Sequence, residues 1–177
     1  MLPGLDIWLN HFEYHANVLR AVPTEVSNRL TDAERAAIAG SIATFQLGEQ
    51  SEGGTLLRAV RQFARTREVN GLVRNTELFI KEEQHHAALM GTFMDHHGIP
   101  RKQKDWTDGV FRFVRKLAGY ELCLHVLVAA ELIGNVYYRA LEAATGCQHL
   151  RVLCRMLVAD ELAHIGFESD VLLALRG

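Results

Sequence analysis

The chain has 177 residues, of which 49% are apolar and 23% are charged, and its formal net charge is −2. This length provides for one domain with a buried core, and the composition excludes a disordered chain. The balance of 19 basic against 21 acidic residues gives no electrostatic basis for nucleic acid or an anionic membrane as a partner.

The expected lack of a signal peptide and the spacing of the cysteines indicate a reducing compartment. The N-terminus has no basic start, and Asp6 interrupts its apolar stretch, so we expect no signal peptide. The apolar runs are shorter than the roughly 18–20 residues of a membrane span. Cys123, Cys147 and Cys154 lack CxxC spacing, which argues against a disulfide framework or a thiolate zinc site. We therefore predict a cytoplasmic protein without a membrane span.

Apolar residues recur with helical spacing along the whole chain, which predicts an all-α fold. Residues 7–20 predict a short helix within an N-terminal helical extension, residues 1–30. Residues 31–177 are predicted to form a single domain. Its first helix is expected over about 32–66, because Thr31-Asp-Ala-Glu34 matches a capping box, with Gly53-Gly54 as a weak point.

Three further long helices follow in the predicted domain. The first covers about 70–97 and ends at Gly98 and Pro100, where the chain cannot continue a helix. The others cover about 107–145 and about 148–175. Four long helices joined mostly by short connections are most economically packed as an antiparallel four-helix bundle.

Two of these helices carry the same pattern of acids and histidines. Residues 82–86 read Glu-Glu-Gln-His-His, and residues 160–164 read Asp-Glu-Leu-Ala-His. A glutamate and a histidine three residues apart lie on one helix face, so both can reach one metal ion. His86 aligns with His164 and is therefore preferred as the ligand, and His85 stays open as the alternative.

The other two long helices each carry a lone glutamate, Glu49 and Glu131, within an apolar or small stretch. Burying such a glutamate costs several kcal/mol unless another group pairs with it. At about 1.5 Å per residue, Glu131 and Glu161 both lie about 20 Å from the turn between their helices, so they share one level. Glu52 competes with Glu49 for the same role. The layout is that of a dinuclear carboxylate site.

This constellation resembles the ferritin-like di-iron carboxylate superfamily, and the resemblance covers about residues 32–175. The residues that carry it are Glu49, Glu83, His86, Glu131, Glu161 and His164. The acids that precede the two motifs, Glu82 and Asp160, are most similar to those of the oxygen-activating branch. That branch includes soluble acyl-carrier-protein desaturases, bacterial multicomponent monooxygenases, the ribonucleotide reductase small subunit and arylamine N-oxygenases.

The resemblance implies a ferritin-like bundle that binds two iron ions per chain, with manganese as the alternative metal. One ion would be bound by the first set of ligands and the other by the second set (Glu49, Glu83 and His86; Glu131, Glu161 and His164). Glu83 and Glu161 would bridge the ions. Glu82 and Asp160 would each support the histidine of the opposing motif.

The remaining polar residues receive more ordinary interpretations. Tyr138 lies seven residues after Glu131 and shares its helix face, which makes it a candidate redox-active or hydrogen-bonding tyrosine, or a core aromatic residue. Several histidines are interpreted as exposed helix-end residues (His11, His15, His96 and His97). The first two nevertheless have the spacing of an incidental metal site.

Carboxylate sites that also contain nitrogen suit iron or manganese. The resemblance therefore implies an enzyme, a di-iron oxygenase or oxidase that uses O2 to hydroxylate, desaturate or N-oxygenate a small or lipid-like organic substrate. An electron-donor protein and a second copy of the chain are left open as partners. The alternatives are a ferroxidase or iron-storage protein of the bacterioferritin type, a peroxide-scavenging di-metal protein, and a metal-free helical interaction protein.

Overall fold

The protein is all-α, as the apolar spacing predicts. The computed structural model describes residues 4–18, 21–22, 29–50, 53–67, 69, 71–103 and 119–175, and all regular secondary structure in these residues is helical. The helices are α1 (Leu5–Asn17), α2 (Asp32–Glu49), α3 (Gly54–Arg67), α4 (Leu72–His96), α6 (Tyr120–Ala144) and α7 (Gln148–Leu175).

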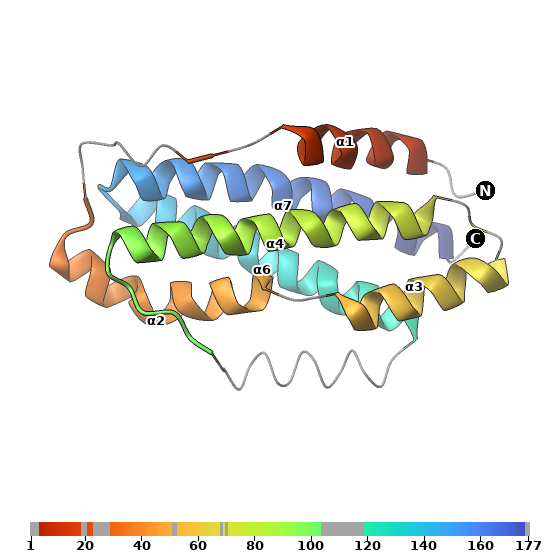
Figure 1. The fold of residues 1–177 in the computed structure, drawn as a ribbon, viewed down its shortest axis with the longest axis horizontal. Coiled ribbons are helices and arrows are strands. Elements are labelled where there is room, and N and C mark those ends of the chain that lie inside the picture. Colours follow the sequence, from red (N-terminus) through yellow and green to blue (C-terminus); the bar gives the residue numbers. More distant parts are fainter. Residues whose placement is uncertain are drawn as a thin grey trace.

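The helices run along a common long axis (Figure 1). α4, α6 and α7 extend over most of the molecule, and α2 and α3 follow one another along α4. α6 packs against α7, and α3 also contacts α6. α4 contacts α1, α2, α3 and α7, so it is the central element of the fold.

Most predicted helix limits agree with the structure. α7 has the predicted bounds, and α4 differs from its prediction by no more than two residues at either end. The third long helix, α6, begins at Tyr120, because its N-cap Gly119 has an extended backbone with a ψ of 171°. This corrects the continuous helix expected from about residue 107, and residues 104–118 lie outside the described residues. The predicted division into an extension, 1–30, and a domain, 31–177, stays a prediction.

The helix expected over 32–66 is two helices, which corrects that prediction. α2 ends at Glu49, and α3 begins at Gly54. Gly53 has a φ of +64°, a value that residues with a side chain rarely adopt. A Cβ atom at this position would also collide with the side chain of Ile80 on α4. The glycine thus lets the chain turn beside α4.

The capping box at the start of α2 is present and has a further partner. The Glu34 backbone N–H donates to the Thr31 hydroxyl at 3.1 Å, and the Thr31 backbone N–H donates to the Glu34 carboxylate at 2.8 Å. That carboxylate also accepts from the Thr145 hydroxyl and the Gly146 backbone N–H. Backbone hydrogen bonds from Thr31 and Gly146 lower the pKa of Glu34 to about 2. α2 is therefore tied to the turn between α6 and α7.

A Thr31→Ala variant is expected to unfold with a free energy lower by about 1 kcal/mol, because the first turn of α2 loses its side-chain acceptor. Urea denaturation followed by circular dichroism measures this loss. Thr31→Ser keeps the hydroxyl and serves as the control. Equal stability of all three proteins would show that the capping box contributes nothing.

The end of α4 is fixed by a Schellman motif. Gly98 has a φ of +64° and donates its backbone N–H to the Asp95 carbonyl at 3.3 Å. The Ile99 backbone N–H donates to the Met94 carbonyl at 2.8 Å. These two bonds satisfy carbonyls that the helix leaves open, so the predicted stop at Gly98 has a defined geometry.

Two apolar clusters fill the interior, one toward each end of the long helices. The Phe79 cluster contains Leu5, Phe12, Leu56, Val60, Leu72, Leu78, Phe79, Ile80, Tyr120, Cys123, Leu124, Leu127, Phe167 and Val171. The Phe93 cluster contains Ile42, Ala43, Met90, Phe93, Met94, Ile99, Tyr138, Leu141, Cys147, Leu150, Leu153, Cys154 and Leu157. On α4, α6 and α7 the residues between the clusters include buried acids and histidines. A polar layer therefore crosses the core between the clusters.

One helix has the length and composition of a membrane span. Among the described residues, α6 is the one helix that is long and apolar enough to cross a membrane. Of the 18-residue stretch that meets this criterion, 39% is buried inside the protein. The same helix carries Leu124, Leu127 and Tyr138 into the two apolar clusters. The prediction of a chain without a membrane span stays a prediction.

Candidate metal centre

The polar layer contains all six residues that the sequence selects as metal ligands. Glu49 is the last residue of α2, and the other five lie within the long helices: Glu83 and His86 on α4, Glu131 on α6, and Glu161 and His164 on α7. Their ligand atoms form two groups that share members. Helix periodicity aligns each pair on one face, and helix packing brings the four helices together.

The first group contains Glu49, Glu83, His86 and Glu161, and one ligand atom from each lies within 4.8 Å of the others. His86 Nδ1 lies 3.5 Å from the Glu83 carboxylate. It lies 3.9 Å from a carboxylate oxygen of both Glu49 and Glu161. The histidine thus faces three carboxylates that come from three different helices.

The second group contains Glu83, Glu131, Glu161 and His164 within the same limit of 4.8 Å. His164 Nδ1 lies 3.1 Å from Glu83, 3.6 Å from Glu161 and 3.7 Å from Glu131. Glu83 and Glu161 belong to both groups. They therefore occupy the positions that bridging carboxylates would require.

The acids that precede the two motifs hold the histidines in a crossed arrangement. Asp160 of the second motif lies 3.0 Å from Nε2 of His86 in the first motif. Glu82 of the first motif lies 3.2 Å from Nε2 of His164 in the second. When each Nε2–H donates to its acid, the lone pair of each Nδ1 faces the carboxylates. The hydrogen bond from each Nε2 to its acid thus sets the tautomer and the ring orientation of the histidine.

The central atoms of this layer have no hydrogen-bond partners although they are buried. They are Glu49 Oε2, Glu83 Oε1, His86 Nδ1, both carboxylate oxygens of Glu161, and His164 Nδ1. Buried polar atoms in proteins are almost always paired, because an unpaired one costs free energy. Carboxylates and lone pairs facing one another repel, and protons or cations are what relieve the repulsion. The donor set thus fits divalent metal ions.

The pKa values show how protons bind here in the absence of a metal. Burial, followed by the Glu83 charge, raises the pKa of Glu49 well above its ordinary value. Burial and the Glu131 charge do the same for Glu161. Burial opposes protonation of His86, but its contacts with Asp160 and Glu83 prevail and raise the pKa of His86 to about 10. The metal-free layer therefore takes up protons as the chain folds.

Tyr138 belongs to the site through its hydroxyl. The side chain is 1% exposed, and the hydroxyl donates to Glu49 Oε1 at 2.7 Å. Met90 Sδ lies 3.6 Å from the Tyr138 hydroxyl oxygen. Burial and the charge of Glu49 raise the pKa of Tyr138 well above its ordinary value. The hydroxyl therefore stays protonated and positions Glu49.

α1 adds residues that the sequence interpretation places on the surface. His15 Nδ1 lies 2.6 Å from the Glu82 carboxylate and 3.8 Å from Asp160, and the His11 and His15 rings are 4.1 Å apart. Both histidines are half-buried, which corrects their interpretation as exposed residues. Burial by itself would raise the pKa of Glu82, but hydrogen bonds with His164 and His15 prevail and lower this pKa to about 2. α1 thus reaches the supporting acids.

Glu168 is a further buried acid that the sequence analysis misses. It is 1% exposed, and neither carboxylate oxygen has a hydrogen-bond partner. Burial and the Glu131 charge raise its pKa well above the ordinary value. The signal is present in the sequence, because Glu168 follows His164 by four residues and Glu161 by seven and therefore shares their face of α7.

Two alternatives from the sequence have different outcomes. His86, which is fully buried, is the histidine placed among the carboxylates, whereas His85 is half-buried. Glu52, the competitor of Glu49, lies outside the described residues.

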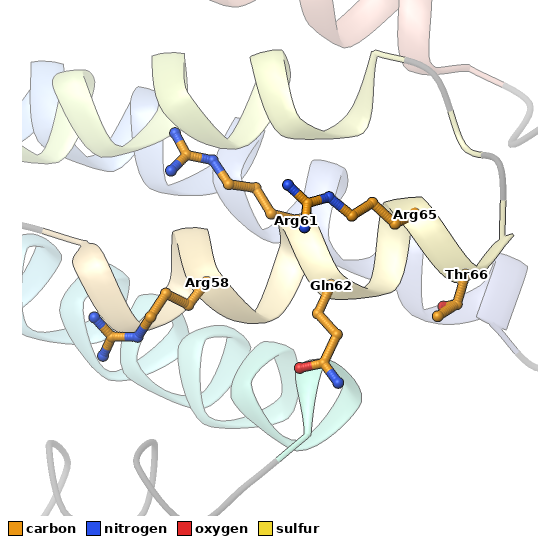
Figure 2. A pocket seen from close by; sticks show the side chains of 5 residues that line it. All are labelled: Arg58, Arg61, Gln62, Arg65 and Thr66. Atoms are coloured by element: carbon orange, nitrogen blue, oxygen red, sulfur yellow. The ribbon is translucent and has the colours of Figure 1, made fainter.

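The surface hollow in Figure 2 lies on α3 and is not part of the polar layer. It is lined by Arg58, Arg61, Gln62, Arg65 and Thr66. The three arginines are exposed, and Arg61 forms an ion pair with Glu77 at 3.0 Å. This hollow therefore has the character of a solvated basic helix face.

No protein-family model, curated protein or solved structure matches the chain.

Proposed function

We propose that the protein is a di-metal carboxylate oxidoreductase that uses O2 to oxidise a small or lipid-like organic substrate. The single observation that carries the proposal is the convergence of four carboxylates and two histidine Nδ1 atoms in two groups that share Glu83 and Glu161. The oxygen-rich donor set with one imidazole per group favours iron, with manganese as the alternative.

We also propose that the described helices form a ferritin-like four-helix bundle. In this arrangement α2 and α3 together take the place of the first helix, and α4, α6 and α7 are the other three. The polar layer between the two apolar clusters supports the proposal, because it lies where a bundle would enclose a metal centre. α1 belongs to the extension and covers one side of this layer.

The chain's own residues would prepare the site for oxygen chemistry. Two ferrous ions, when bound, supply the electrons that reduce O2. Asp160 and Glu82 hold the ligand histidines in place, so the ligands need little rearrangement when the ions bind. The Phe79 and Phe93 clusters, which lie on either side of the layer along the long helices, would exclude water from it. The Tyr138 hydroxyl holds Glu49 in position.

The proposal is tested by metal content and oxygen uptake. Protein purified without chelators is analysed for metals, beside Glu83→Ala and Glu161→Ala variants and a Glu121→Ala control on the exposed face of α6. We expect two iron or manganese ions per chain in the wild type and the control, and none in the other two variants. Oxygen consumption after anaerobic ferrous loading is expected to follow the metal content.

Other outcomes point to the other functions. Hundreds of irons per assembly would indicate storage of the bacterioferritin type. Two ions that react with hydrogen peroxide but not with O2 would indicate peroxide removal. Failure of ferrous-loaded wild-type protein to retain any metal would overturn the proposal and leave a helical interaction protein.

A further inference from the structure

We propose that His96, His97 and His149 form a second, mononuclear site for a divalent transition-metal ion of the Zn²⁺ type. His96 is the last residue of α4, His97 is its C-cap, and His149 is the second residue of α7. At about 1.5 Å per residue, the site lies about 15–18 Å from His86 and Glu161 along these helices. It is therefore separate from the carboxylate centre and does not depend on the function proposed for that centre.

The three side chains converge on one point. One ring nitrogen from each lies within 4.8 Å of the others. The ring centroids are 4.9 Å apart for His96 and His97, 5.6 Å for His96 and His149, and 5.5 Å for His97 and His149. A tetrahedral ion bound to imidazoles at about 2.0–2.1 Å would hold the nitrogens about 3.4 Å apart. Small ring rotations would therefore close the site.

Two of the three histidines are buried and have nitrogens without partners. His97 is 8% exposed and His149 is 3% exposed, and no hydrogen bond reaches His97 Nε2 or His149 Nδ1. The Phe93 ring packs at 4.5 Å from the His97 ring and at 5.0 Å from the His149 ring, and so restricts both. His96 is exposed, which provides a path for the ion and leaves a coordination position open to water.

The charge state suits metal binding. Burial, then the neighbouring His96, His149 and Arg29, lower the pKa of His97 to about 4. Burial and His96 also lower the pKa of His149. The two buried imidazoles are therefore neutral at neutral pH, which is the form that binds a metal. Imidazole ligands without a carboxylate favour Zn²⁺, Cu²⁺ or Ni²⁺ over the harder Mg²⁺ and Ca²⁺.

The backbone holds the ligands before any ion arrives. The Schellman motif at Gly98 fixes the last turn of α4, which carries His96 and His97. The hydrogen bonds from Thr145 and Gly146 to Glu34 hold the turn that leads into His149. An ion bound here would link the end of α4 to the start of α7.

The test is a comparison of Zn²⁺ binding by equilibrium dialysis, with zinc ion as the only added ligand. The variants are His96→Ala and His97→Gln, with His125→Ala as a control for loss of a histidine on the exposed face of α6. We expect each variant to bind one Zn²⁺ per chain fewer than the wild type and the control. Loss of a residue that only supports a ligand lowers metal affinity roughly 10–100-fold. Loss of a ligand histidine should lower the affinity for the Zn²⁺ ion at this site by more than that.

The quantity compared is the number of Zn²⁺ ions bound per chain by the wild type and by each variant. Zinc bound at the carboxylate centre is the same in all of them and does not affect the difference. His96 is exposed, so His96→Ala tests the site without removing a core residue, and circular dichroism checks that each variant is folded. Equal Zn²⁺ stoichiometry and affinity in the wild type and in folded His96→Ala would overturn the proposal, whatever the carboxylate centre does.

Discussion

A Glu161→Gln variant is expected to lose both ions of the carboxylate centre and yet to be more stable than the wild type when both proteins are free of metal. Glu161 belongs to both ligand groups, so its loss removes a donor from each. Without metal, its carboxylate is fully buried and both oxygens lack a hydrogen-bond partner. An uncharged amide of the same shape removes this repulsion. Because burial and the Glu131 charge raise the pKa of Glu161, keeping it protonated costs about 1.4 kcal/mol for each pH unit above its ordinary pKa, and an amide avoids this cost.

The measurement combines metal analysis with chemical denaturation of metal-free wild type, Glu161→Gln and a Glu121→Gln control. Glu121 is exposed in the first turn of α6, so its substitution should change the free energy of unfolding by only a few tenths of a kcal/mol. A metal-free Glu161→Gln protein less stable than the metal-free wild type would contradict the account of a repulsive carboxylate layer. Retention of two ions by this variant would contradict the ligand assignment.

The stabilisation produced by Mn²⁺ is expected to increase with pH. Glu49 and Glu161 have raised pKa values, so each stabilises the metal-free fold below its ordinary pKa of 4.5 and costs stability as the pH rises above it. The stability that His86 contributes is complete below pH 6.5 and is lost as the pH rises through about 10. Metal ions replace these protons. The metal-free protein therefore weakens over this window while the loaded protein does not.

Thermal unfolding with and without Mn²⁺ measures this effect. For a chain of this size each kcal/mol moves Tm by about 2–4 °C, and several groups titrate together, so the Tm difference should widen by on the order of 10 °C from about pH 6 to about pH 8.5. Glu34 does not contribute, because its lowered pKa affects stability only as the pH falls from 4.5 to about 2. Glu161→Gln should show no Mn²⁺-dependent change at any pH. A Tm difference in the wild type that is constant over the window would contradict the proton-linked binding.

Local sequence signals predict much of this fold because they act over a few residues. The capping box at Thr31 and the stop at Gly98 each depend on neighbours within one turn, and both are found where expected. The pairs Glu83/His86 and Glu161/His164 share a face by helix periodicity alone. The common level of Glu131 and Glu161 follows from the simple rise per residue. The level of Glu49 does not, because the helix expected to connect it to the turn before α4 is divided into α2 and α3.

Apart from Glu168, whose place on the ligand face of α7 follows from helix periodicity, the missed features depend on contacts between distant segments. His15 contacts Glu82 only because α1 packs along α4, and no periodicity within α1 shows this. His149 meets His96 and His97 only because the end of α4 and the start of α7 lie together. The break before Gly54 depends partly on Ile80, which lies on another helix.

The break after α2 makes the two halves of the carboxylate centre unequal. Glu49 is the last residue of α2 and its side chain is 10% exposed, whereas its counterpart Glu131 lies in the middle of α6 and its side chain is 6% exposed. A carboxylate at a helix end can move without displacing a whole helix. Glu49 is held in the described structure by the hydrogen bond that the Tyr138 hydroxyl donates to it. The ion on the Glu49 side should therefore exchange faster. Stepwise loading with two different metals would then place the second metal beside Glu49, giving a mixed-metal centre of defined order.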